Sequence, residues 1–165
     1  PSYVKKIIFP VEILPLVPLG AALVHGAFNF LILLAALAWT GHLTPSVVLY
    51  PLMLLPLLLL ALGLSWFFAA WGVFIKDMSQ IVTPFVQMLM FLSPVLYPAS
   101  AVPRGFRPLY HSNPLGAVIE SCRNVALGQA INWENWGTAF VVGLTAALLG
   151  HAFFRHSREE FADVL

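Results

Sequence analysis

Long apolar stretches separated by short polar turns dominate the chain. Residues 14–39, 47–75, 81–97 and 136–154 each have about the length of a membrane-spanning helix, which needs about 20 mostly apolar residues. No Lys, Arg, Asp or Glu interrupts any of them. A charge at the centre of such a helix costs about 2.5–3.5 kcal/mol on insertion. The pattern therefore predicts an all-α integral membrane protein with four transmembrane helices.

Residues 98–135 break this pattern, since prolines and polar residues recur there. Asn113-Pro114 predicts a helix start, with an N-cap and a proline at the first helical position. Gly128 predicts the end of that helix. A second short helix is expected over 104–111. Both are too short and too polar to span a membrane, so we expect amphipathic helices in a membrane-entering hairpin or an interfacial lid. The apolar face of the first helix holds Leu115, Val118, Ile119, Cys122 and Ala126.

Composition supports the membrane assignment and excludes other classes. The chain is 60% hydrophobic and 9% charged, whereas soluble domains are about 45–50% apolar and about 25% charged. A net charge of +1 gives no broad basic field for nucleic acid, so no nucleic-acid partner is expected. The single cysteine, Cys122, excludes an internal disulfide and a multi-cysteine metal site. We expect neither a metal nor a cofactor.

The distribution of basic residues predicts the orientation. If residues 1–12 are cytoplasmic, four spans place five basic residues inside and three outside, in the sense of the positive-inside rule. The inside set is Lys5, Lys6, Lys76, Arg155 and Arg158, and the outside set is Arg104, Arg107 and Arg123. Residues 98–135 are then extracytoplasmic.

The chain lacks a nucleotide-binding loop. Its only lysines are Lys5, Lys6 and Lys76, and none follows a glycine, as the phosphate-cradling motif requires. Energy for any transport must therefore come from a partner chain.

Four stretches resemble one family: FPVEILPLV at 9–17, FLSPVLYP at 91–98, NPLGAVIESCR at 113–123 and FADVL at 161–165. They resemble ABC-2 type permeases, most of all the branch that exports polysaccharides such as O-antigen, capsule or teichoic acid chains. The resemblance covers essentially the whole chain, so residues 1–165 are expected to be a single ABC-2 transmembrane domain.

The resemblance implies six helices per subunit and a homodimer with two ATPase subunits in the bacterial cytoplasmic (inner) membrane. Such proteins pass a lipid-linked glycan outward. This chain would hold the last four helices of an amino-terminally truncated subunit. Residues 1–12 then match a cytoplasmic region that couples to the ATPase, and residues 98–135 match an extracytoplasmic region of gate helices.

The expected ATPase contact consists of Lys5, Lys6, Phe9 and Glu12. Charged side chains can pair across that interface while Phe9 enters an apolar cleft. The alternative is that the two lysines only mark the cytoplasmic end of a helix.

The expected gate residues are Glu120, Arg123, Arg104 and Arg107. Glu120 and Arg123 are three residues apart on one helix and can form an ion pair. They can also pair across the dimer, or bind glycan hydroxyls or a lipid phosphate. The guanidinium groups of Arg104 and Arg107 match the phosphate oxygens of a lipid headgroup. The alternative is an ordinary interfacial helix whose arginines snorkel.

Candidate channel-lining residues are Phe91, Tyr97, Tyr110, His25 and Asn29. Aromatic rings can stack on sugar rings, and Ser93-Pro94 predicts a bend close to Phe91 and Tyr97. His25 and Asn29 are four residues apart and share a helix face. Polar groups at that depth usually point into the bundle, in a helix–helix hydrogen bond or in a conduit.

Three other functions compete with polysaccharide export. An ABC-2 exporter of drugs or small lipids has the same hydropathy, and a neighbouring gene would separate the two. An integral membrane enzyme needs a paired nucleophile and base, and Ser65 in Gly63-Leu64-Ser65 has no His placed by sequence to activate it. A structural anchor without a conduit predicts no loss of surface glycan on gene deletion.

Overall fold

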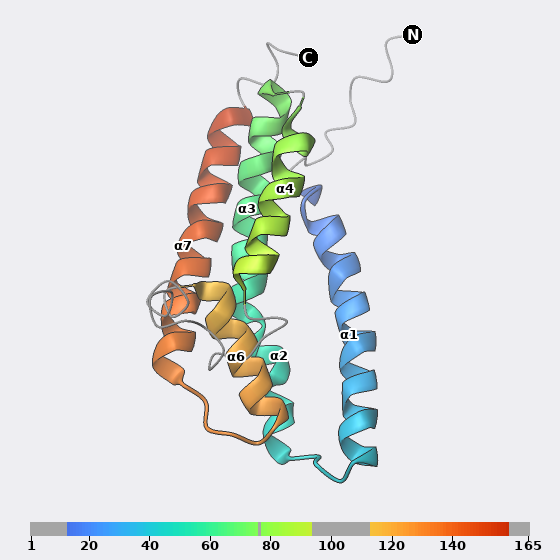
Figure 1. Ribbon diagram of the computed structural model, residues 1–165. Coiled ribbons are helices and arrows are strands. Elements are labelled where there is room, and N and C mark those ends of the chain that lie inside the picture. Colours follow the sequence, from blue (N-terminus) through green and yellow to red (C-terminus); the bar gives the residue numbers. More distant parts are fainter. Residues whose placement is uncertain (1–12, 76, 94–112, 159–165) are drawn as a thin grey trace.

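The computed structural model describes residues 13–75, 77–93 and 113–158, and all regular elements in these ranges are helical (Figure 1). They follow one another as α1 (Leu16–Trp39), a 3₁₀ helix η3 (Pro45–Leu49), α2 (Tyr50–Met53), α3 (Leu55–Phe74), α4 (Met78–Leu92), α6 (Pro114–Ala126) and α7 (Trp133–Arg158). This confirms the all-α class.

Within the part of the chain that the structure describes, three helical segments are long and apolar enough to cross a membrane: Leu16–Trp39, Pro45–Val73 and Trp133–Ser157. They correspond to the first, second and last predicted spans. The third predicted span, 81–97, corresponds to α4, whose 15 residues cover about 22 Å of an apolar layer about 30 Å thick. The rest of the predicted span, residues 94–97, lies outside the described residues.

The start of α4 corrects one predicted boundary. The predicted spans 47–75 and 81–97 leave residues 76–80 as a short polar turn between them, but the helix already begins at Met78, with Asp77 as its N-cap residue. Met78 is buried. Burial of this side chain favours a helix, although the polar residues beside it favour a turn.

Helices α3 and α7 pack along each other with backbone against backbone. A Cβ added at Gly63 would lie 2.6 Å from the amide nitrogen of Ala147 and closer still to the Ala146 carbonyl. One at Gly150 would meet the carbonyl group of Gly63, and one at Gly143 would meet the Pro56 carbonyl oxygen. Small residues at these crossings let the two helices approach closely, as is common within membranes. We refer to Gly63, Gly143 and Gly150 as the glycine seam.

Helix α6 is a packed part of the bundle, beside α2 and the first turns of α7 (Figure 1). Its buried core side chains include Val118, Cys122 and Val125, which pack in one cluster with Met53 of α2 and Ala139 of α7. Burying a side chain of this kind stabilises the fold by about 1.5–3 kcal/mol. This burial fixes the position of α6 against the spanning helices.

Both predicted ends of α6 are confirmed. The Asn113 side chain accepts a hydrogen bond from the Leu115 amide at 3.0 Å, and Pro114 occupies the first turn. Gly128 follows the helix with φ of +67°, a conformation that glycine adopts without steric cost. The Ser46 hydroxyl then donates to the Val125 carbonyl at 2.9 Å, which ties the end of α6 to η3.

Helix α1 contacts the other helices through its carboxyl-terminal half. Leu37 is its buried residue, in a cluster with Val47 and Ala126. Phe30 stacks on Tyr50 with ring centroids 5.0 Å apart. The amino-terminal half of α1 is largely exposed within this chain.

Candidate functional site

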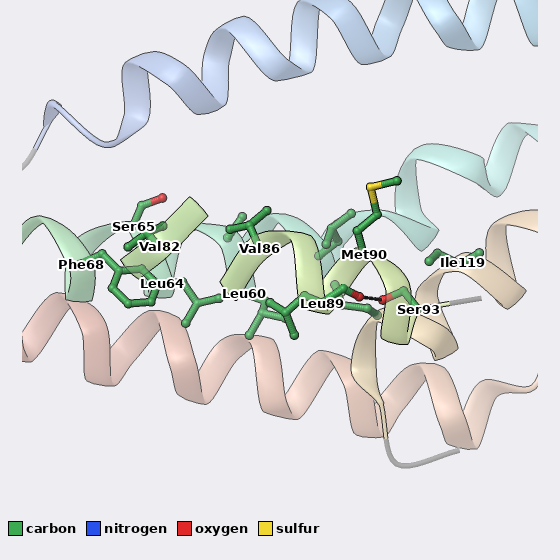
Figure 2. Close-up of a pocket in the computed structure, with 13 residues that line it drawn as sticks. Leu60, Leu64, Ser65, Phe68, Val82, Val86, Leu89, Met90, Ser93 and Ile119 are labelled. Atoms are coloured by element: carbon green, nitrogen blue, oxygen red, sulfur yellow. Dashed lines mark hydrogen bonds between the residues drawn. The ribbon is translucent and has the colours of Figure 1, made fainter. Parts of the chain in front are cut away.

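An apolar cavity of about 540 Å³ lies between α3, α4 and α6 (Figure 2). Phe68 lies at one end, and Met90, Ser93 and Ile119 lie toward the other (Figure 2). We call it the inner cavity. Its lining consists of Leu57, Leu60, Ala61, Leu64, Ser65, Phe68, Val82, Val86, Leu89, Met90, Ser93, Leu115 and Ile119.

A second cavity, of about 310 Å³, lies between α1, α2, α3 and α6. We call it the outer cavity, because it lies at the end of the bundle that the basic residues predict to be extracytoplasmic. Its lining consists of Leu33, Tyr50, Leu54, Leu57, Val118, Ile119, Cys122, Arg123 and Ala126.

The two cavities adjoin, because Leu57 and Ile119 line both. We call the two adjoining cavities together the α6 groove. From Tyr50 to Phe68 their lining residues extend over about 27 Å along α2 and α3, at 1.5 Å per residue. The α6 groove therefore runs along most of an apolar layer about 30 Å thick.

Local helical geometry explains the lining of the inner cavity. Leu57, Leu60, Leu64 and Phe68 recur every three or four residues on α3, and such residues share a helix face. Val82, Val86, Leu89 and Ser93 do the same on α4.

The inner cavity offers almost no polar chemistry. Ser93 satisfies its own hydroxyl by donating to the Leu89 carbonyl at 2.7 Å (Figure 2). Ser65 is the other polar side chain in the lining. A hydrocarbon surface suits this space, whereas a polar ligand would lose its hydrogen bonds to water there without replacing them.

The outer cavity adds three residues with larger polar groups to the lining: Tyr50, Cys122 and Arg123. Burial raises the pKa of the Cys122 thiol to about 12, so the thiol is neutral at physiological pH. The groove thus changes from apolar to cationic along its length.

Aromatic rings surround the Phe68 end of the inner cavity. Phe68 contacts Phe85 of α4 at 6.0 Å and Phe67 at 5.7 Å, measured between ring centroids. Phe67 also contacts Trp71 and Phe153 of α7. These ring contacts join α3, α4 and α7 at the end of the bundle opposite to Arg123.

A further apolar hollow of about 590 Å³ lies over the glycine seam. Gly63, Phe67, Gly150, Ala152 and His156 belong to its lining. Close to this seam, the ring of His151 meets Trp66 edge-on at 4.8 Å, and the buried His151 Nδ1 has no hydrogen-bond partner among the described residues.

Part of the predicted site lies in the described residues. Arg123 lines the outer cavity, and Glu120 is partly buried on the same helix. His25 and Asn29 are exposed on α1, and Phe91 is 71% exposed on α4. Of these five residues, Arg123 alone contributes to the α6 groove, and the roles predicted for all five stay predictions. The other predicted residues lie outside the described residues: Lys5, Lys6, Phe9, Glu12, Tyr97, Arg104, Arg107 and Tyr110.

The residues of the inner cavity were missed by sequence reasoning. Their spacing on α3 is helical, but nearly every residue of Leu55–Phe74 is apolar, so no face stands out in the sequence. Tyr50 was missed because it occurs beside a proline at the start of an apolar stretch. In the described ranges, no group of three or more His, Cys, Asp or Glu is placed to hold a metal ion.

The fold and groove define a helical membrane protein, and comparison with known proteins places it in a family. The profile of the ABC-2 type transporter membrane family matches residues 1–127. The chain belongs to the ABC-2 type transporter family. It is a multi-pass protein of the inner membrane.

The chain is similar to O-antigen export system permease proteins named RfbA. It is 24% identical to one from Klebsiella pneumoniae over 98% of this chain, and 28% identical to one from Myxococcus xanthus over 96% of this chain. The matched region spans 63% and 62% of those relatives. No solved structure matches the chain.

Proposed function

We propose that this chain is the membrane-spanning permease part of an ABC exporter that moves a lipid-linked polysaccharide across the cytoplasmic membrane. The observation that carries the proposal is the similarity to O-antigen export permeases along nearly the whole chain. An apolar groove that ends at Arg123 agrees with an amphiphilic cargo. Neither feature favours an exporter of drugs.

The proposed partners follow from this role. A separate ATPase subunit hydrolyses ATP and contacts Lys5, Lys6, Phe9 and Glu12. A second copy of the permease completes the conduit, and membrane lipids surround it. Glu120, Arg123, Arg104 and Arg107 act at the outer gate, and Phe91, Tyr97, Tyr110, His25 and Asn29 line the path of the glycan.

Deletion of the gene in its host tests the function. We expect surface glycan to disappear and lipid-linked glycan to accumulate in the cytoplasmic leaflet, with both restored by the intact gene. Normal surface glycan together with altered drug resistance would favour the other exporter class instead.

The coupling role is tested by charge reversal. Lys5→Glu combined with Lys6→Glu should weaken co-purification of the ATPase subunit, because two favourable ion pairs become repulsive. Lys76→Glu, also predicted to be cytoplasmic, is the matched control. Unchanged co-purification in the double variant would leave the two lysines as markers of a helix end.

The gate role is tested at Glu120. Glu120→Ala should lower glycan export, whereas Glu134→Ala, which removes an exposed carboxylate in the first turn of α7, should not. Wild-type surface glycan in the Glu120 variant would return this residue to an ordinary position on an interfacial helix.

A further inference from the structure

We propose that the end of α1, the 3₁₀ helix η3 and the end of α6 form one rigid joint, through which α6 follows the movement of α1 during transport. We call residues 37–49 and 125–130 the outer joint, since the ends of α1 and α6 lie at the same end of the bundle (Figure 1). This inference rests on the proposed export function, in which α6 belongs to the outer gate, and adds to it the contact that moves this helix.

Both helices end at the outer joint in the same closed geometry. At the end of α1, the His42 amide donates to the Leu37 carbonyl at 3.0 Å around Gly41, whose φ is +70°. At the end of α6, Gly128 has φ of +67°, and the next amide donates to the Asn124 carbonyl at 2.7 Å. A helix end closed in this way satisfies its last carbonyls and fixes the direction in which the chain leaves.

The 3₁₀ helix η3 ties these two ends together. The Ser46 hydroxyl donates to the Val125 carbonyl at 2.9 Å and lies 2.8 Å from the Thr44 hydroxyl. A Cβ added at Gly128 would lie 2.8 Å from the Thr44 methyl group, so the backbone there lies directly against Thr44. Ser46 and Val125 are 79 positions apart in the chain, so their hydrogen bond joins two separate parts of the fold.

A buried apolar cluster lies beside these polar contacts. Leu37 of α1, Val47 of η3 and Ala126 of α6 form it, and Leu33 and Leu34 of α1 pack against it. Within a membrane, close packing of this kind and hydrogen bonds between helices hold helices together. The outer joint has both, so we expect it to keep its geometry when the helices move.

Helix α1 connects the outer joint with the cytoplasmic side. Its 24 residues extend over about 36 Å, and residues 1–12, for which we propose contact with the ATPase, precede it in the chain. Helix α6 meets α2 and α7 through apolar side chains such as Val118, which permit small shear movements. The hydrogen bond to the Val125 carbonyl instead fixes α6 to η3. A displacement of α1 should therefore carry α6 with it, against α7.

Spin-label distances test the rigidity of the outer joint. The labels are placed on exposed residues of the Cys122→Ala permease, in the intact permease–ATPase complex in lipid nanodiscs, with labelled copies diluted in unlabelled ones. Labels on Val48→Cys and Leu127→Cys should keep the same distance without nucleotide and with ATP and vanadate. Labels on Leu127→Cys and Leu148→Cys of α7 should change their distance. A change in the first distance, or none in the second, would overturn the inference.

A crosslink across the outer joint tests it in the opposite sense. Leu37→Cys and Ala126→Cys, again with Cys122→Ala, place two thiols in the buried cluster. Once a short bifunctional thiosulfonate joins them, which peptide mapping verifies, export should continue at the level of the reduced variant, because the crosslink fixes a contact that does not open. Loss of surface glycan on crosslinking, with recovery on reduction, would show that the joint opens and would contradict the proposal.

Loosening the outer joint tests its role in transport. Ser46→Ala with Val47→Ala removes the hydroxyl group and one member of the cluster, so the distance between labels at Val48 and Leu127 should become broadly distributed. Export should fall about tenfold, which is within the usual range of coupling between sites, while basal ATP hydrolysis stays unchanged.

Ser121→Ala is the matched control for this loosening. Its hydroxyl donates to the Ala117 carbonyl of its own helix at 2.7 Å, so its removal leaves the outer joint intact and should leave export unchanged. Wild-type export from a loosened joint, or an equal loss in the control, would contradict the transport role. If the double variant fails to fold, the distances in the otherwise native complex decide the question.

The two levels of proposal fail separately. If gene deletion abolishes surface glycan but the distance between Val48 and Leu127 changes with nucleotide, export stands and the outer joint is not rigid. If deletion leaves surface glycan normal, the export function itself is wrong, whatever the label distances show.

Discussion

Substitution of Gly150 by alanine tests the packing of the glycine seam. The added Cβ would lie 2.9 Å from the Gly63 carbonyl carbon and closer to its oxygen, which is backbone and cannot rotate away. The helices must therefore separate or slide. Overpacking of this kind costs about 1–3 kcal/mol, and the higher helix propensity of alanine offsets about 1 kcal/mol of that. We expect a net loss of about 0–2 kcal/mol in the free energy of unfolding, against a gain of about 1 kcal/mol at a helical glycine whose added Cβ meets nothing.

The assay is unfolding of the detergent-solubilised protein by sodium dodecyl sulfate, followed by tryptophan fluorescence or circular dichroism. Gly137→Ala is the control on the same helix, because a Cβ there meets nothing within 4 Å. Gly72→Ala is the equivalent control on α3. Both controls should be neutral or slightly stabilising.

The double variant sharpens the test. Once one methyl group has pushed the helices apart, a second at Gly63 meets a looser contact, so Gly63→Ala and Gly150→Ala together should cost less than their sum. If the Gly150→Ala variant had the same free energy of unfolding as Gly137→Ala, the reasoning would be wrong, because the close backbone approach would then not contribute to stability.

Three more predictions concern α6 and its ends. Asn113→Ala removes the N-cap and should lower stability by about 0.5–2 kcal/mol in the same unfolding titration, whereas Asn113→Ser should largely retain it; equal losses would exclude capping. Gly128→Ala should cost about 1–2 kcal/mol, because a Cβ at φ +67° is strained and would lie 2.8 Å from the Thr44 methyl group; a stable variant would contradict this. Cys122 should react with iodoacetamide far more slowly in the folded than in the unfolded protein, because burial raises its pKa from 9.0 to about 12 and keeps the unreactive thiol form. Between pH 9 and pH 12 the Cys122 thiol is deprotonated in the unfolded chain but protonated in the folded protein. The contribution of Cys122 to the free energy of unfolding should therefore be complete below pH 9 and fall as pH rises from 9 to 12. Rapid alkylation of the folded protein at neutral pH would contradict the burial.

Local rules accounted for the parts of the fold that one short segment controls. The start of α6 followed from Asn113-Pro114 and its end from Gly128, because caps and left-handed glycines act within a few residues. The spanning helices followed from the absence of charge. The start of α4 was not predicted, because the polar residues beside Met78 favour a turn and the burial of Met78 arises only when the helices pack.

The site was less predictable than the fold. Charged and aromatic residues stand out in an apolar sequence, and Arg123 was found for that reason. The inner cavity is lined instead mostly by leucines, valines and other apolar residues that are chemically like their neighbours, so only the packing of α3, α4 and α6 distinguishes them. Likewise, the partners of Gly63 and Gly150 depend on the register of two helices that are far apart in the chain.

The glycine seam also limits how this domain can change shape. Where backbone contacts backbone, neither helix can slip along the other without collisions at Gly63, Gly143 and Gly150, so α3 and α7 should move together as one rigid unit. Helix α1 packs on the other helices through its carboxyl-terminal half, so it can tilt relative to α3 and α7. A displacement of α7 near Arg155 should therefore be transmitted about 30 Å along the helix to Trp133 and Trp136, because the paired helices bend little.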